Sequence, residues 1–181
     1  MKVTELSLPG LKLIEPKVFE DARGFLLESY NQQRYRSAGI DSVFVQDNHS
    51  CSGPGVLRGI HYQSSPGQDK LVRVVHGRIF DVAVDLRPES KTFGKWQGVY
   101  LDAERHQQLF VPRGFGHGFC VVSDRAEMLY RLSSFYNPDT EQTVKWNDPD
   151  LAIEWPVADP VVSDRDRSGE PFAELRRRVL G

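Results

Sequence analysis

The chain has 181 residues, with 23 Lys and Arg against 25 Asp and Glu, and a formal net charge of −2 at pH 7. This length suits one domain with a substantial core, so we expect a single domain over residues 1–181. The balanced charge argues against nucleic acid or an acidic membrane surface as the main partner, while leaving room for a local basic pocket that binds a small anion.

The N-terminal segment MKVTELSLPG lacks the apolar core of a signal peptide. The longest apolar runs have about five residues, far short of the roughly 20 that span a bilayer. Cys51 and Cys120 fit no CxxC spacing and are too few for a disulfide framework. We therefore expect a cytoplasmic protein whose two thiols are reduced.

Short strands with alternating apolar residues dominate the predicted elements. In chain order they are FLLESY, VFVQDNHS, GVLRGIHYQ, KLVRVV, RIFDVAVDLR, WQGVYLD, HQQLFVP, GFCVVS, AEMLYRLSSFY and QTVKWND. Residues 79–86 alternate between two faces, and the segment HGR just before them predicts a hairpin turn with Gly77 at its tip. So many short strands favour an all-β barrel or sandwich.

Helix signals are few. The segment NQQRYRSAG predicts a short helix that ends at Gly39, and EPFAELRRRVLG at the C-terminus predicts another with arginines in its last turn. Between them, residues 149–171 are rich in proline and irregular. A long loop of this kind inside a compact domain is often functional.

The stretch VLRGIHYQ, residues 56–63, places Arg58 and His61 inside an apolar strand. Burying such groups is costly unless each has a partner, so the inner side of this strand is expected to line a polar cavity. Strict alternation would send the two residues to opposite faces. Gly59 lies between them, and we predict a β-bulge there that returns both side chains to one face.

Two further segments carry polar groups that chemistry could use. PRGFGHGF places His117 between glycines, and SDRD sets Asp164 and Asp166 beside Arg165. Taken alone, PRGFGHGF is also typical of an exposed turn, and SDRD is more typical of a solvated loop of mixed charge than of a functional site. The chain has no P-loop, GxSxG or GxGxxG motif, so the chemistry open to its His, Tyr, Lys and Asp residues is proton transfer.

A metal centre is the main alternative for a β-barrel with scattered histidines. Zinc and iron sites need three or four converging His, Cys or carboxylate ligands, and the sequence has no HxH pair. We therefore expect no metal. A metal-dependent oxygenase of the same fold stays open as an alternative that a metal assay would test.

Nine segments occur in the order and spacing of the dTDP-4-dehydrorhamnose 3,5-epimerases, from about Leu8 to Asp166. They are RGFLLESY, QDNHS, GVLRGIHYQ, KLVRVVHGRIFDVAVDLR, KTFGKW, PRGFGHGF, LYRLSSFYNP, WNDPDLAIEWP and SDRD. The resemblance implies an all-β cupin (jelly-roll) barrel with a few short helices, a homodimer and no cofactor. It also implies epimerisation of dTDP-4-keto-6-deoxy-D-glucose at C3 and C5 to dTDP-4-keto-L-rhamnose, in dTDP-L-rhamnose synthesis.

The same resemblance implies roles for individual residues. His61 would be the base, Asp166 would orient it, and Tyr130 would be the acid on the opposite face. Lys70 would stabilise the enolate, with Asp81 supporting that lysine. Contacts to the sugar nucleotide would come from Arg23, Glu28, Gln46, Asn48, Arg58, His117, Tyr136, Glu141 and Arg165.

These residue types match what the reaction needs. A hydrogen next to a ketone becomes removable when a fixed cation or donor stabilises the enolate oxygen. Inversion then requires a proton donor on the other face of the ring, and a tyrosine is neutral at pH 7. Tyr136 would stack on thymine, and Arg165 stands where many members of the family carry lysine.

Two other functions stay open. Relatives that epimerise only C3 or only C5 would use the same four residues, His61, Asp166, Tyr130 and Lys70. A non-catalytic protein that binds nucleotide sugars would keep the arginines and aromatic residues but would need neither His61 nor Tyr130. The expected homodimer would cover exposed strand edges, for which exchange of N-terminal strands is one route.

Overall fold

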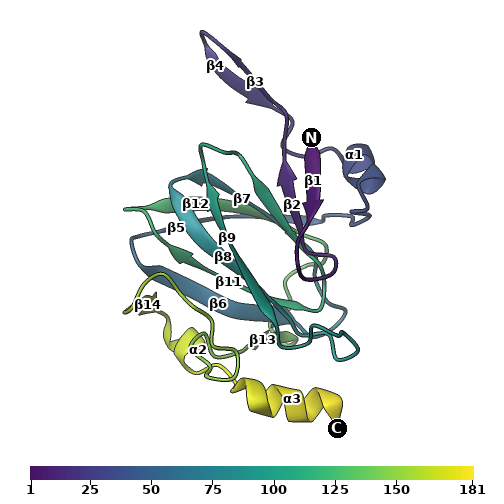
Figure 1. Cartoon of the computed structure of the whole chain (residues 1–181), viewed down its shortest axis with the longest axis vertical. Coiled ribbons are helices and arrows are strands. Elements are labelled where there is room, and N and C mark those ends of the chain that lie inside the picture. Colours follow the sequence, from purple (N-terminus) through teal and green to yellow (C-terminus); the bar gives the residue numbers. More distant parts are fainter.

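Two facing sheets make up the body of the molecule, as the computed structural model of residues 1–181 shows (Figure 1). The first sheet has the strand order β1 (Lys2–Glu5), β2 (Lys12–Glu15), β10 (Gln108–Val111), β7 (Lys70–His76), β12 (Ala126–Leu132) and β5 (Gln46–Ser52). The second has the order β13 (Glu141–Thr143), β6 (Val56–Gln63), β11 (Phe115–Val121), β8 (Arg78–Asp85) and β9 (Trp96–Asp102). The short strand β14 (Val161–Val162) joins β6 in parallel, whereas all other pairs are antiparallel.

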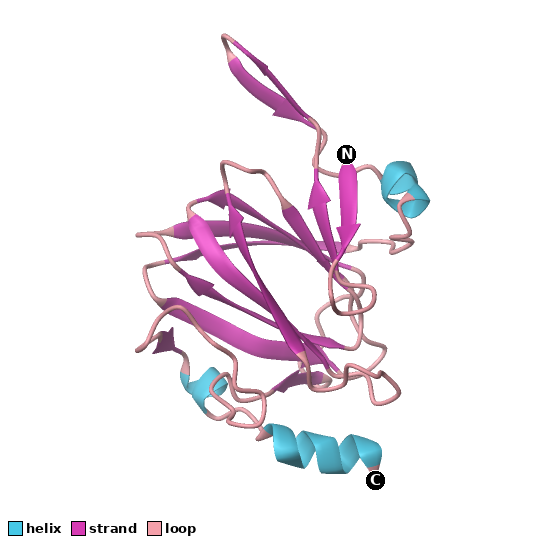
Figure 2. Ribbon diagram, viewed as in Figure 1, coloured by secondary structure: helices cyan, strands magenta, loops and turns pink.

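The predicted all-β class is confirmed, and the two sheets have the arrangement of a jelly roll. The hydrogen bonding leaves them as separate sheets and does not close them into one barrel. A third, two-stranded sheet, β3 (Val18–Asp21) with β4 (Gly24–Leu27), projects away from the body as a hairpin (Figure 2).

Three short helices complete the structure: α1 (Gln32–Ser37), α2 (Asp164–Arg167) and α3 (Phe172–Leu180). The predicted helices at α1 and α3 are confirmed. Asn31 caps α1 by accepting a hydrogen bond from the Arg34 backbone N–H, and Gly39 follows its end with a φ of +76°. By contrast, the SDRD segment is not a solvated loop, because three of its four residues form α2.

The predicted hairpin at Gly77 is wrong. Strands β7 and β8 lie in different sheets, and β7 pairs with β10 and β12 while β8 pairs with β11 and β9. Gly77 has a φ of +73°, and a Cβ there would lie 1.9 Å from the Arg125 carbonyl oxygen. The glycine therefore lets the chain cross from one sheet to the other at a crowded corner.

The alternation predicted for residues 79–86 is confirmed, and both faces of β8 are buried. Ile79 and Ala83 belong to the core between the two sheets. Phe80, Val82 and Val84 belong to a second core under α3 and the irregular segment before it. Asp81 lies in the middle of this buried strand and is itself fully buried.

The predicted irregularity at Gly59 is also confirmed. The pairing of β6 with β11 joins His61 to His117 but Arg58 to Phe119, so β6 has one extra residue at this point. Gly59 has a φ of +134°, and a Cβ on it would lie 2.5 Å from the Gly118 Cα. The bulge brings Arg58 and His61 into one cavity, as described below. None of the three helices has the length and hydropathy that a membrane span would require.

Candidate active site

A cavity of about 350 Å³ lies between the two sheets, within the range of small-molecule sites. One wall comes from β5, β7 and β12 and the other from β6 and β11. Nine of the residues singled out from the sequence line this cavity, namely Asn48, Arg58, His61, Lys70, His117, Tyr130, Tyr136, Glu141 and Arg165.

His61 and Asp166 form a hydrogen-bonded pair at the cavity wall. The His61 Nε2 lies 2.5 Å from the Asp166 Oδ1, the imidazole is 24% exposed and the carboxylate side chain 4%. Burial alone would raise the pKa of Asp166, but the hydrogen bond and charge of His61 hold it below its usual value. The aspartate can therefore orient the imidazole and stabilise its protonated form.

A second pair of the same type lies beside the first. The His117 Nε2 lies 2.8 Å from the Asp81 Oδ1, and both side chains are buried. The resemblance implies that Asp81 supports Lys70, but its hydrogen bond goes to His117, and only its charge acts on the lysine. The other carboxylate oxygen, Oδ2, is buried with no hydrogen-bond partner.

Lys70 points into the cavity from the start of β7. Its one hydrogen bond, from Nζ to the His61 carbonyl oxygen, is long at 3.4 Å. Burial lowers the pKa of Lys70 to about 8, against the opposing charges of Glu141 and Asp81. Because this hydrogen bond is weak, the Lys70 ammonium is available to bind a negatively charged oxygen atom of a ligand.

Tyr130 and His61 line the cavity from different sheets. Tyr130 is carried by β12, where it pairs with Asn48 of β5 and Val72 of β7. His61 is carried by β6 in the other sheet, yet both side chains line the same cavity. A ring held between the two walls could therefore meet the imidazole on one face and the phenol on the other.

The mouth of the cavity has a polar cluster formed by Tyr136, Glu141 and Arg165. The Arg165 guanidinium lies 2.6 Å from the Glu141 Oε2. Contact with Glu141 raises the pKa of Tyr136. Gln46 lies behind this cluster, accepting a hydrogen bond from the Tyr136 backbone N–H and donating one to Asn48.

Several lining residues were missed from the sequence. Ser50 lines the cavity with a buried hydroxyl that has no partner, and Ser52 accepts a hydrogen bond from the Arg58 Nε at 3.2 Å. That bond leaves the two terminal nitrogens of Arg58 free to bind an anion. The strand from Gln46 to Ser52 is polar at nearly every position, a readable signal, since every second residue of a strand faces the same side and one of its faces therefore had to be polar. Gln68, Phe119, Met128 and Leu132 complete the lining.

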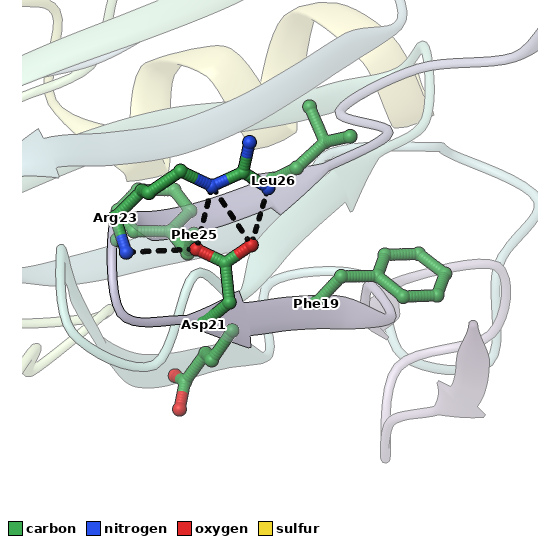
Figure 3. Close-up of a pocket in the computed structure, with 7 residues that line it drawn as sticks. Phe19, Asp21, Arg23, Phe25 and Leu26 are labelled. Carbon is green, nitrogen blue, oxygen red and sulfur yellow. Dashed lines mark hydrogen bonds and ion pairs between the residues drawn. The ribbon is translucent and has the colours of Figure 1, made fainter.

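Arg23 and Glu28 do not reach this cavity within one chain. Arg23 lies at the turn of the projecting hairpin, where it pairs with Asp21 at 2.5 Å and is largely exposed (Figure 3). Glu28 lies beside α1, within 3.3 Å of Arg34 and 3.1 Å of Asn31. Nor does any group of three His, Cys, Asp or Glu side chains come close enough together to hold a metal ion.

The two jelly-roll sheets enclose a polar cavity with two histidine–aspartate pairs, a lysine and a tyrosine, a set of groups suited to proton transfer. The family model described as dTDP-4-dehydrorhamnose 3,5-epimerase matches residues 5–174. The chain belongs to this family. It is 52% identical to the dTDP-4-dehydrorhamnose 3,5-epimerase of Pseudomonas aeruginosa, over 96% of this chain and 97% of that protein.

A longer epimerase from Neisseria gonorrhoeae is 48% identical over 99% of this chain, which spans 55% of that protein. Among solved structures, the 3,5-epimerase of Legionella pneumophila in complex with dTDP-4-keto-L-rhamnose superposes with a TM-score of 0.94 at 44% identity, covering 99% of this chain and 96% of that one. A 3'-monoepimerase from Streptomyces bikiniensis in complex with dTDP-quinovose has a TM-score of 0.91 at 40% identity, covering 97% and 90%.

Proposed function

We propose that the protein epimerises dTDP-4-dehydro-6-deoxy-D-glucose at C3 and C5 to dTDP-4-dehydro-L-rhamnose. The observation that carries this proposal is the placement of His61 and Tyr130 on opposite walls of one cavity, with Lys70 beside them. A 3,5-epimerase of the family binds dTDP-4-keto-L-rhamnose in the Legionella structure, which supports the choice of substrate.

In the proposed reaction, the neutral His61 removes the proton from the carbon next to the C4 ketone. The electron pair of the C–H bond forms a C=C bond to C4 while the π pair of the C4 carbonyl moves to its oxygen, and the resulting enolate is stabilised by the Lys70 ammonium. Tyr130 then donates its phenolic proton to the same carbon from the opposite face, which inverts that centre. Solvent restores the proton on Tyr130 and removes the one on His61, so that the second centre can follow without any cofactor.

The diphosphate end of the substrate needs cations and donors. Arg58 is held by Ser52 so that its terminal nitrogens are free, and Arg165 lies at the cavity mouth. Both suit phosphate oxygens because a guanidinium offers several donors in one plane. Tyr136 is exposed beside Arg165, where it can stack on the thymine ring.

We also propose that the protein acts as a homodimer in the cytoplasm, each chain forming one domain. The hairpin of β3 and β4 projects from the body and exposes Phe19, Phe25 and Leu26 (Figure 3). Exposed apolar strands need cover, and a second copy of the chain would supply it. In such a dimer the hairpin would carry Arg23 to the cavity of the partner subunit. This would explain why Arg23 does not reach the cavity of its own chain.

A second candidate function is epimerisation at one carbon only. The 3'-monoepimerase from Streptomyces bikiniensis has nearly the same fold, so the fold alone permits this outcome. Both reactions need the same base, the same acid and the same cation to stabilise the enolate. They differ in whether the ring can present its second carbon to the base.

The test is solvent deuterium incorporation. The protein is incubated with dTDP-4-dehydro-6-deoxy-D-glucose in deuterated water, and NMR or mass spectrometry follows the label at C3 and C5, with His61→Ala as the control. Label at both carbons, with the L-rhamno product trapped by a reductase, supports the 3,5-epimerase. Label at one carbon supports the monoepimerase, and no label with nucleotide binding intact rejects catalysis.

A further inference from the structure

The segment that delivers Asp166 to His61 is folded against the strand that carries His61. Val161 and Val162 of β14 pair in parallel with Val56 and Leu57 of β6. The chain then turns into the single-turn helix α2, whose third residue is Asp166. The position of the carboxylate therefore depends on how this helix starts.

Ser163 caps the start of α2. Its hydroxyl oxygen accepts a hydrogen bond from the Asp166 backbone N–H at 3.2 Å, and its carbonyl oxygen accepts one from the Arg167 N–H at 3.0 Å. A serine in this position satisfies a backbone donor that the helix itself leaves unpaired. Here the satisfied donor belongs to the residue whose side chain contacts His61, so the cap holds the backbone from which that side chain projects.

The contact between Asp166 and His61 tolerates little displacement. The two polar atoms lie 2.5 Å apart, and the Asp166 side chain is almost fully buried. Ser163 and the backbone N–H of Gly59 both favour the charged carboxylate, adding to the larger effect of His61 on the pKa of Asp166. Ser163 itself is exposed, so replacing its hydroxyl opens no cavity in the core.

We propose that Ser163 is a positioning residue, which holds Asp166 in place so that Asp166 keeps the His61 imidazole aligned for proton transfer. The inference rests on the proposed function and assigns a role to a residue that does not line the cavity. Loss of the cap would let the one-turn helix fray, and His61 would spend less time in the reactive orientation. Binding of the sugar nucleotide would be largely unaffected.

The first experiment compares Ser163→Ala with Ser163→Thr and Ser163→Asn in the deuterium assay. We expect kcat to fall about 3- to 30-fold in Ser163→Ala, the range that corresponds to loss of a helix cap, with KM unchanged within about twofold. Threonine and asparagine also cap helices and are expected to restore most of kcat.

Ser168→Ala is the matched control. The Ser168 hydroxyl donates hydrogen bonds to the carbonyl oxygens of Asp164 and Arg165, each at 3.0 Å, so this change weakens the same helix at its other end. It removes no contact to Asp166, and we expect kcat to be retained. If Ser168→Ala slows the reaction as much as Ser163→Ala does, general weakening of α2 is the cause and the proposal is wrong.

The second experiment does not depend on activity. In the resting protein, NMR should detect a low-field proton from the hydrogen bond between His61 and Asp166, assigned by its loss in His61→Asn. We expect the signal to shift or broaden in Ser163→Ala and to stay unchanged in Ser168→Ala. An unchanged signal together with wild-type kcat in Ser163→Ala would overturn the proposal. If the wild-type protein labels neither carbon, the proposed function fails, while this signal still tests the positioning.

Discussion

Two histidine–aspartate pairs, His61 with Asp166 and His117 with Asp81, lie at one cavity, and they differ in how far they are exposed. The imidazole of His61 is 24% exposed, whereas that of His117 is 8% exposed and its partner Asp81 is fully buried. Asp166 comes from the one-turn helix α2, while Asp81 comes from β8, an inner strand between β11 and β9. The open pair can exchange a proton with a ligand and with water, and the enclosed pair is better suited to hold a fixed ring.

The two carboxylates differ as well. Asp166 is held by His61 and by a helix cap, and its pKa is lowered. Asp81 has one oxygen on His117 and one without any hydrogen bond, and its charge also favours the protonated form of Lys70. The comparison teaches that identical residue pairs acquire different roles through exposure and through the number of groups that share the carboxylate.

The largest expected difference is in catalysis. His61→Asn should lower the rate of deuterium incorporation by about 10³-fold, since general-base catalysis is worth roughly 10²–10⁴. His117→Asn removes a polar contact in the wall and should lower the rate by about tenfold. Rate measurements on both variants at one pH test the comparison. Equal losses would mean that the enclosed pair takes part in proton transfer directly.

For stability we expect the opposite order: loss of the Asp81 carboxylate should lower the free energy of unfolding more than loss of the Asp166 carboxylate. Asp81→Ala leaves the buried His117 Nε2 without its hydrogen-bond partner and removes one of the two negative charges that act on Lys70. It should lower the free energy of unfolding by about 3 kcal/mol. Asp166→Ala, whose partner faces the cavity and its water, should cost about 1 kcal/mol. Urea unfolding monitored by tryptophan fluorescence provides both values. A larger loss in Asp166→Ala would contradict the assignment of Asp81 as the structural member.

Lys70 should make activity and stability respond to pH in opposite directions. Above its pKa of about 8, Lys70 loses the positive charge that stabilises the enolate, so kcat/KM should fall about tenfold per pH unit. Between pH 8 and the usual lysine pKa, about 10.4, the unfolded chain binds more protons at this residue than the folded one. Its contribution to stability therefore rises with pH in that window.

Lys70→Met is the control for that pH dependence. Its residual activity should be low and should lack the decline above pH 8. From pH 7.5 to 10 the wild type should gain stability relative to the variant, measured by urea unfolding at each pH. A wild-type profile that stays flat to pH 10 would show that Lys70 remains charged throughout.

The smallest expected effect concerns the cavity mouth. Arg165→Lys keeps the charge but loses the planar group that contacts Glu141. We expect KM to rise about threefold with kcat unchanged. Calorimetric binding of dTDP should weaken by the same factor. A change in kcat would indicate that Arg165 also acts through its neighbour Asp166.

Local patterns in the sequence were enough to predict much of the fold. The period of two located most of the strands, Asn31 and Gly39 bounded α1, and the extra residue at Gly59 was predicted from the need to bring Arg58 and His61 to one face. These features depend on a few neighbouring residues, so short stretches carry them. The order of nine motifs was specific enough to predict the family that the comparison with known proteins then showed.

Only the tertiary structure decided which strands pair and which side chains come into contact. The turn at Gly77 has the residues of a hairpin, yet β7 and β8 pair with strands far away in the chain, because both faces of β8 are buried against different cores. The bond between His117 and Asp81 joins residues 36 positions apart. Alternation tells which residues share a face of a strand, but the partner across the sheet is set by the packing of the whole chain.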